Sequence, residues 1–238
     1  MTATFVLVHG AWLGGWCWHG VADTLRAEGH VVHTPTLTGC SEAAQERPPG
    51  VDLSTHLNDV SCLVDDQDLQ GVRLVGHSYA GAVVRGVAAL RPERLAAVVY
   101  LDAFTPGPGE SVLDLAAWAD AARQVAQGQG DGWRMPPPPP ALLGLAADDP
   151  ALARLTAFPM AAFAQPQPAI ESPGVPRAYV RCAANPDPTL KAIAARAQTA
   201  GWTYREIAAP HCAMLTHPTA VAAVLKGLTR PDRMAEPA

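Results

Sequence analysis

The stretch VRLVGHSYAG, at residues 72–81, decides the fold. It is an apolar run that ends in Gly-His-Ser-Tyr-Ala-Gly and continues into a second apolar segment at residues 82–90. This order predicts a strand, a very sharp turn and a helix. We interpret it as a nucleophile elbow of the G-x-S-x-G type. Gly76 and Gly81 leave room for the strained backbone that lifts the Ser78 hydroxyl above the end of the strand.

An ordinary strand-to-helix turn is the alternative, because Gly and Ser are common turn residues. The elbow is favoured because an apolar strand and helix flank Ser78, and because His211 follows far downstream in a loop. The chain order Ser, acid, His differs from both common protease orders. The free N–H groups of the helix after Ser78 would face the place where negative charge develops.

Composition and charge exclude several classes of protein. The 238 residues suit one α/β domain with an insertion, 49% of them are hydrophobic, and the net charge of −5 argues against a nucleic-acid partner. The five cysteines are scattered without C-x-x-C spacing, so we expect buried thiols rather than disulfides or zinc. The chemistry read from the motifs needs no metal or organic cofactor.

The N-terminal sequence predicts the location of the protein. The start of the chain lacks a positively charged segment, and the apolar run at residues 5–8 is too short for a signal peptide or a membrane span. We therefore expect a cytoplasmic protein without a membrane partner. A homodimer is compatible with the sequence.

Apolar runs of strand length recur along the chain and alternate with helical patterns. This alternation predicts an α/β fold with a six-stranded, mostly parallel, doubly wound sheet. The predicted strands are residues 5–8, 30–33, 72–75, 95–101, 177–182 and 203–207.

The composition changes after the strand at residues 95–101. Five consecutive prolines at 136–140 predict a stiff connector, and helical periodicity flanks it at 113–125 and 142–163. We interpret residues 106–172 as a helical cap inserted into a single domain, 1–238, whose core is formed by residues 1–105 and 173–238.

Four separated stretches form one combination: FVLVHGAW (5–12), GGWCW (14–18), GHSYAG (76–81) and HCAML (211–215). Together they resemble the α/β-hydrolases that include plant methyl esterases and hydroxynitrile lyases. The bacterial esterase branch is the nearest match, because LDAF (101–104), GWR (132–134) before the prolines and FPMAAFAQP (158–166) also look like it. The resemblance covers nearly the whole chain.

The resemblance implies roles for individual residues. Ser78 would be the nucleophile, His211 the general base, and the backbone N–H groups of Ala11 and Tyr79 the oxyanion hole, in agreement with the elbow. The family's lyases carry Thr and Lys where this chain has Gly10 and Cys212, which disfavours cyanohydrin cleavage. The candidates for substrate contact are His9, Gly10, Trp12 and Trp133.

The triad acid is the main departure from the family pattern. The position of the family's Asp holds Asn185 here, and a neutral amide cannot stabilise an imidazolium as a carboxylate does. Asp187 lies two residues further on, and Pro186 would redirect it towards His211. Asp102 ends the strand next to the elbow strand and is a second candidate. Asn185 itself, in a weakened triad, is the third.

The sequence therefore predicts a serine hydrolase that cleaves small hydrophobic or aromatic carboxylic esters through an acyl-enzyme. Two alternatives keep the fold. The first is a lyase, cyclase or thioesterase-type tailoring enzyme that uses the same pocket. The second is a ligand-binding protein with a weakened triad.

Overall fold

A computed structural model describes residues 2–41, 50–170 and 174–228. Its centre is a six-stranded sheet of order β2-β1-β3-β4-β7-β8 in which every strand pair is parallel. The predicted sheet is confirmed. The strands are β1 (Thr4–Val8), β2 (Val31–His33), β3 (Val72–His77), β4 (Leu95–Leu101), β7 (Arg177–Cys182) and β8 (Thr203–Ile207).

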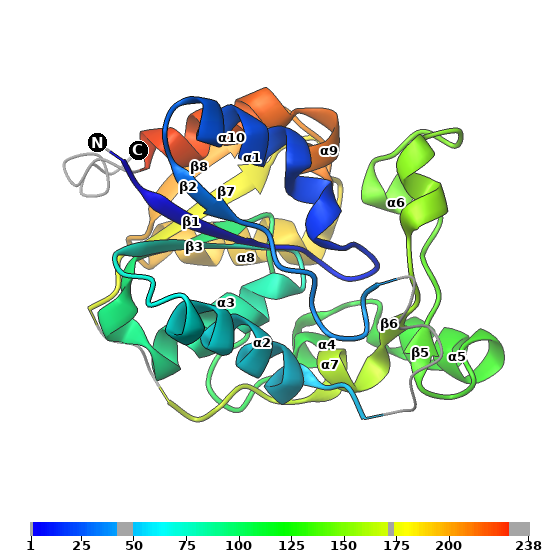
Figure 1. Ribbon diagram of the computed structural model, residues 1–238. Coiled ribbons are helices and arrows are strands. Elements are labelled where there is room, and N and C mark those ends of the chain that lie inside the picture. Colours follow the sequence, from blue (N-terminus) through cyan, green and yellow to red (C-terminus); the bar gives the residue numbers. More distant parts are fainter. Residues whose placement is uncertain (1, 42–49, 171–173, 229–238) are drawn as a thin grey trace.

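Helices cover both faces of the sheet (Figure 1). Because neither face meets water, the central strands are apolar along their length instead of alternating. Val72, Leu74 and Val75 of β3 are all fully buried. One face carries α1 (His19–Ala27) and α10 (Pro218–Gly227), and the other α2 (Leu53–Asp66), α3 (Ala80–Leu90) and α8 (Pro188–Thr199).

The register of the central strands brings three loops to one edge of the sheet. Val8 at the end of β1 lies opposite Gly76, and His77 at the end of β3 lies opposite Leu101. The carboxyl ends of β1, β3 and β4 therefore meet at the same edge. This is where open α/β sheets place their ligand sites.

The turn between β3 and α3 requires its glycines. A Cβ at Gly76 would lie 2.5 Å from the carbonyl oxygen of Ala80, and one at Gly81 would lie 2.0 Å from that of Phe104. The second glycine position of the G-x-S-x-G motif holds Ala80 in this chain. The backbone that packs closely against the Phe104 carbonyl is that of Gly81, one residue later. Both glycines allow backbone segments to pack closer than a side chain would permit.

The connection between β4 and β7 holds several short elements. They lie beyond the edge of the sheet, with α5 and α6 furthest from it in Figure 1. These elements are α4 (Val112–Leu115), α5 (Ala119–Gln129), β5 (Arg134–Met135), α6 (Pro140–Leu143), the 3₁₀ helix η4 (Pro150–Arg154), β6 (Phe158–Pro159) and α7 (Met160–Ala164).

The helical periodicity predicted for residues 142–163 is wrong. α6 ends at Gly144, which takes the left-handed conformation with φ 71°. Pro150 and Pro159 lack the backbone N–H that a continuous helix needs. The segment instead includes β6, which pairs antiparallel with β5. The predicted boundary at 172/173 lies outside the described residues.

Gly81→Ala should destabilise the protein by about 1–3 kcal/mol, because the added methyl overlaps the Phe104 carbonyl. Gly128→Ala is the matched control. Gly128 lies inside α5 with nothing within 4 Å of its Cβ position, so Ala should stabilise the helix by about 0.5–1 kcal/mol. Urea unfolding measures both changes. A Gly81→Ala midpoint equal to that of the wild type would contradict the packing described.

Candidate active site

Ser78 lies at the tip of the turn between β3 and α3, with a backbone φ of 55°. This left-handed conformation costs a non-glycine residue about 1–3 kcal/mol and persists only where neighbouring groups hold it. Here the N–H of Ser78 donates to the Leu101 carbonyl at 3.3 Å, and the Ser78 carbonyl accepts from the N–H of Phe104 at 3.0 Å. Hydrogen bonds to the last residue of β4 and to the loop that follows it therefore hold the strained turn in place.

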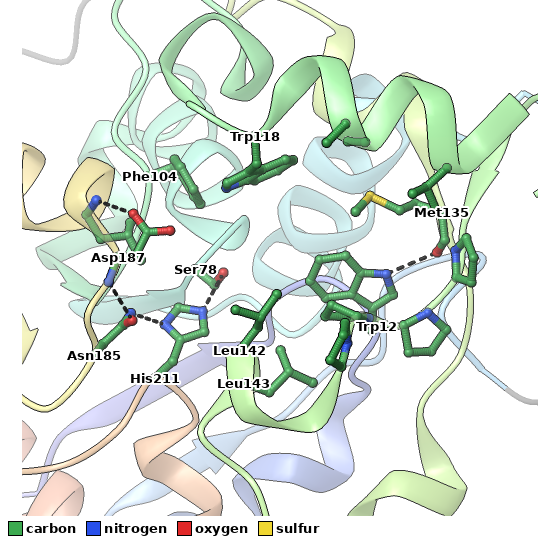
Figure 2. Close-up of a pocket in the computed structure, with 18 of the residues that line it drawn as sticks. Trp12, Ser78, Phe104, Trp118, Met135, Leu142, Leu143, Asn185, Asp187 and His211 are labelled. Atoms are coloured by element: carbon green, nitrogen blue, oxygen red, sulfur yellow. Dashed lines mark hydrogen bonds between the residues drawn. The ribbon is translucent and has the colours of Figure 1, made fainter. Parts of the chain in front are cut away.

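His211 reaches Ser78 from the loop after β8. Its Nε2 lies 3.0 Å from Ser78 Oγ, and its Nδ1 lies 2.8 Å from Asp102 Oδ2. Figure 2 shows the imidazole edge pointing at the Ser78 hydroxyl. Asp102 is fully buried, whereas Ser78 and His211 each keep 8% of their surface exposed. The three side chains form one line of hydrogen bonds from a buried carboxylate to an accessible hydroxyl.

The Asp102 carboxylate fixes the tautomer of His211. An ionised carboxylate only accepts hydrogen bonds, so the proton of the ring lies on Nδ1. Nε2 is then free to accept the proton of Ser78 Oγ, as a general base must. Asn185 Nδ2 lies 2.6 Å from Asp102 Oδ2 and 3.1 Å from His211 Nδ1. With Nδ1 protonated, the amide donates to the carboxylate and packs against the ring.

A buried arginine neutralises the same carboxylate. Arg181 Nη1 donates to Asp102 Oδ1 at 2.6 Å, and the backbone N–H of Cys182 donates to the same oxygen at 3.2 Å. Burial raises the pKa of Asp102. The hydrogen bond and charge of His211, the hydrogen bond of Asn185 and the charge of Arg181 outweigh burial, so the pKa lies below its ordinary value. Asp102 is therefore ionised at neutral pH.

Asp187 does not contact His211. Its Oδ1 accepts the backbone N–H of Leu190 at 3.0 Å and caps the N-terminus of α8. Its own backbone N–H donates to Asn185 Oδ1 at 3.1 Å. The expected redirection of Asp187 by Pro186 therefore does not occur. Of the three candidate acids, Asp102 supplies the carboxylate next to His211, and Asn185 is a hydrogen-bond donor to it.

Two backbone N–H groups beside Ser78, those of Ala11 and Tyr79, donate no hydrogen bond within the described part of the chain. Tyr79 is the N-cap of α3, and Ala11 follows β1 in the adjacent loop. The loop comes close because residue 10 is glycine: a Cβ there would lie 2.9 Å from Ser78 Cβ. Both N–H groups are therefore available to an oxygen next to Ser78.

His9 supports this loop from beneath. Its Nε2 accepts the backbone N–H of Leu37 at 3.0 Å, so Nδ1 carries the proton and donates to the Gly10 carbonyl at 2.8 Å. Burial lowers the pKa of His9 to about 4, against a smaller opposing effect of the hydrogen bond to Gly10. His9 is thus neutral at pH 7, and its two hydrogen bonds connect the loop after β1 with the loop after β2.

A cavity of about 690 Å³ adjoins Ser78 and His211, and most of its wall is apolar. Trp12 forms part of this wall and donates from Nε1 to the Met135 carbonyl at 3.0 Å, which ties the loop after β1 to β5 (Figure 2). The other apolar side chains of the wall are Phe104, Trp118, Ala121, Ala122, Val125, Met135, Pro136, Pro137, Pro138, Pro139, Leu142, Leu143, Pro186, Pro188 and Leu190.

Three of the predicted substrate contacts are not on this wall. His9, Gly10 and Trp133 are absent from the residues that line the cavity. The Trp133 ring instead faces its neighbour Arg134, whose guanidinium carbon lies 5.4 Å from the ring centroid. Trp12 is the one predicted contact that lines the cavity.

Arg181 and much of the cavity wall were not among the site residues predicted from the sequence. Arg181 lies near the end of the run RAYVRC, and a charged residue near the end of a buried strand is a signal for a buried partner. Trp118 and Met135 of the wall come from the insertion. Their only signal was the presence of aromatic and apolar residues in a Pro-rich segment, which does not tell where they point.

The described residues give little support for a cysteine nucleophile or a metal site. Cys212 follows His211, but it is buried, and burial raises the pKa of its thiol to about 12. It is therefore not a thiolate at neutral pH, in line with the predicted packing role. Across residues 2–41, 50–170 and 174–228, no group of three or more His, Cys, Asp or Glu could hold a metal ion. Within the same ranges no helix has the length and apolar character that crossing a bilayer requires.

A model of the Alpha/beta hydrolase family matches residues 5–224. The chain belongs to the alpha/beta hydrolase family. The chain is 48% identical over 113 residues to a carbendazim hydrolyzing esterase from Nocardioides sp. (strain SG-4G), covering 48% of this chain and 47% of that one. It is 34% identical over 110 residues to a pyrethroid hydrolase from Sphingobium wenxiniae, covering 46% and 39%. The matches span about half or less of these relatives.

Solved structures of the alpha/beta hydrolase fold superpose on almost the whole chain. An extracellular alpha/beta-hydrolase from a Paenibacillus species gives a TM-score of 0.82 at 24% identity, covering 97% of this chain and 100% of that one. A pyrethroid hydrolase gives a TM-score of 0.78 at 21% identity, covering 98% and 100%. At these identities the likeness establishes the fold alone.

The buried His9 predicts a pH dependence of stability. The pKa of His9 falls from 6.5 to about 4 on folding, so the unfolded chain binds more protons between these values. The free energy of unfolding should therefore fall as pH is lowered from 6.5 to 4, by up to about 3 kcal/mol for this group. Urea unfolding of His9→Gln should show a smaller slope. His19→Gln, at an exposed site, should keep the wild-type slope, and equal slopes in all three proteins would refute the assignment.

Proposed function

We propose that this protein is a carboxylic ester hydrolase in which Ser78, His211 and Asp102 form the catalytic triad. The observation that carries the proposal is the hydrogen-bonded line from Asp102 through His211 to Ser78, which ends in a largely apolar cavity. This arrangement has the roles and order of a Ser-His-Asp triad. The names of the esterase and pyrethroid hydrolase relatives support the same reaction.

The mechanism follows from the hydrogen bonds. Ser78 Oγ attacks the carbonyl carbon of the ester while its proton passes to Nε2 of His211. The carbonyl oxygen takes the negative charge and accepts hydrogen bonds from the backbone N–H groups of Ala11 and Tyr79. The bond to the leaving group then breaks, and His211 returns the proton to the departing alkoxide. Water attacks the acyl-enzyme by the same route and regenerates the Ser78 hydroxyl.

Asp102 and its partners make this proton transfer favourable. The carboxylate stabilises the imidazolium that forms on His211 and holds its ring in place. Arg181 offsets part of the negative charge, and it keeps the carboxylate ionised inside the protein. Asn185 and the Cys182 N–H complete the set of donors around it. Arg181 and Asn185 are thus positioning residues for Asp102.

The cavity supports small hydrophobic or aromatic esters as substrates. Its volume of about 690 Å³ lies in the range of small-molecule sites, and its few polar groups include Ser78 and His211. Because insertion residues such as Trp118, Met135 and Leu143 form much of the wall, we infer that residues 106–172 act as a cap. A cytoplasmic location and a homodimer stay predictions from the sequence.

The ligand-binding alternative rested on a weakened triad with Asn185 in place of the acid. The Asp102 carboxylate 2.8 Å from His211 Nδ1 speaks against a weakened triad. The lyase, cyclase or thioesterase alternative rested on the same substitution. Ester hydrolysis is the function that the site favours.

Ser78→Ala should abolish hydrolysis of p-nitrophenyl butyrate and also labelling by a fluorophosphonate, because both need an activated serine hydroxyl. Initial rates and mass spectrometry of the labelled protein measure the two effects. A wild-type protein that takes up the label without turning over ester would favour the tailoring enzymes. Wild-type protein with neither property would refute the proposed function.

Asp102→Asn should lower kcat by about 10³–10⁴-fold, because an amide cannot hold the correct imidazole tautomer or stabilise the imidazolium. Asp65→Asn is the matched control, since Asp65 pairs with Arg91 at 2.9 Å in a half-exposed ion pair away from the cavity. Its kcat should equal that of the wild type. Circular dichroism confirms that each variant is folded. A folded Asp102→Asn protein within tenfold of wild-type kcat would exclude Asp102 as the acid.

A further inference from the structure

Asp187 introduces a charge into a cavity whose wall is otherwise almost neutral. It is the one Asp, Glu, Lys or Arg among the described residues that line the cavity. The proposed mechanism does not use it, because the carboxylate next to His211 belongs to Asp102. The charge of Asp102 also lies behind the wall and is matched by Arg181 at 2.6 Å. A bound molecule would therefore meet the field of Asp187.

The position of the Asp187 carboxylate is fixed. Oδ1 accepts the Leu190 N–H at 3.0 Å, and the residue is held between Pro186 and Pro188. Oδ2 has no hydrogen-bond partner within the described part of the chain. Figure 2 shows Asp187 on the same side of the cavity as Ser78, with its backbone nitrogen next to Asn185. Oδ1 thus caps the N-terminus of α8, and Oδ2 is available to a ligand.

The negative charge outweighs the helix end that it caps. The N-terminus of α8 carries the equivalent of about half a positive charge, against a full negative charge on the carboxylate. The Asp187 backbone N–H is already taken by Asn185 Oδ1 at 3.1 Å. The net local field therefore favours a cation. Because Asp187 is only half-buried, water and salt reduce this field without removing it.

Aromatic rings line the same cavity. Phe104 and Trp118 meet edge to face with their centroids 5.9 Å apart, and Trp12 forms a further part of the wall. Aromatic faces attract cations, above all those without a tight hydration shell, such as quaternary ammonium groups. Recognition of an organic cation can therefore combine two features of this cavity, the Asp187 carboxylate and the aromatic rings of its wall.

We propose that Asp187 is a specificity residue that binds a cationic group of the substrate, so that the enzyme prefers esters carrying an ammonium group near the ester bond. The substrate preference rests on the proposed ester hydrolysis. Cation binding at Asp187 is independent of it, since a non-reactive cation would bind there too. Contact near the ester end is expected because Asp187 lines the same cavity as Ser78 and His211, and Figure 2 shows all three on the same side of it.

Two esters of equal shape test the preference. Butyrylcholine and 3,3-dimethylbutyl butyrate differ only in whether nitrogen or carbon bears the three methyl groups. Asp187→Asn removes the charge and keeps an N-cap of similar quality. The ratio of kcat/KM for the cationic ester to that for the neutral ester should fall about five- to tenfold. Asp52→Asn, at the N-cap of α2 outside the cavity wall, should keep the wild-type ratio.

Binding without turnover tests the subsite separately. In Ser78→Ala protein, phenyltrimethylammonium should quench tryptophan fluorescence. Its Kd should rise about five- to tenfold in Ser78→Ala/Asp187→Asn but not in Ser78→Ala/Asp52→Asn, and higher salt should shrink the difference. Equal Kd values, or an equal loss of kcat/KM for both esters in Asp187→Asn, would overturn the proposal. The Kd difference in a protein whose wild type hydrolyses neither these esters nor p-nitrophenyl butyrate, and takes up no fluorophosphonate, would support the subsite and refute the proposed function.

Discussion

The buried carboxylate of Asp102 is the group on which the rest of the site depends. An isolated buried charge would be strongly unfavourable, and here it is balanced by Arg181 on one oxygen and by His211 and Asn185 on the other. These contacts connect the ends of β4 and β7 with the loop after β8. The same backbone segment at the end of β4 holds the strained Ser78 turn. Fold and site are therefore stabilised by one set of contacts.

The position of the carboxylate next to His211 follows from the order of the strands. β4 and β7 are neighbours, with Leu101 opposite Val180, so a side chain from the end of either strand can reach the same imidazole. In this chain the carboxylate comes from β4, and the position after β7 supplies an amide. With this arrangement, His211 still has a hydrogen-bond acceptor beside it, the Asp102 carboxylate, and a donor, the Asn185 amide. It also explains Arg181, because a carboxylate at the fully buried position needs a cation beside it.

The insertion between β4 and β7 gives the cavity its character. Prolines and small helices place apolar side chains such as Trp118 and Leu143 opposite Ser78, and the contact of Trp12 with Met135 joins this layer to the sheet. An apolar wall strengthens electrostatic effects within it. A single carboxylate such as Asp187 can then distinguish ligands of equal shape by their charge.

Local signals such as apolar runs and turn glycines were enough to predict the sheet, the elbow at Ser78, the downstream His211 and the loop of Ala11. It did not determine the choice among Asp102, Asp187 and Asn185, the partner Arg181, or the cavity wall formed by the insertion. Residues such as Asp102 and Arg181 lie 79 positions apart, and no local pattern records that their strands are neighbours. These contacts become visible in the folded chain alone, because the energy of a buried charge depends on which groups the packing brings next to it.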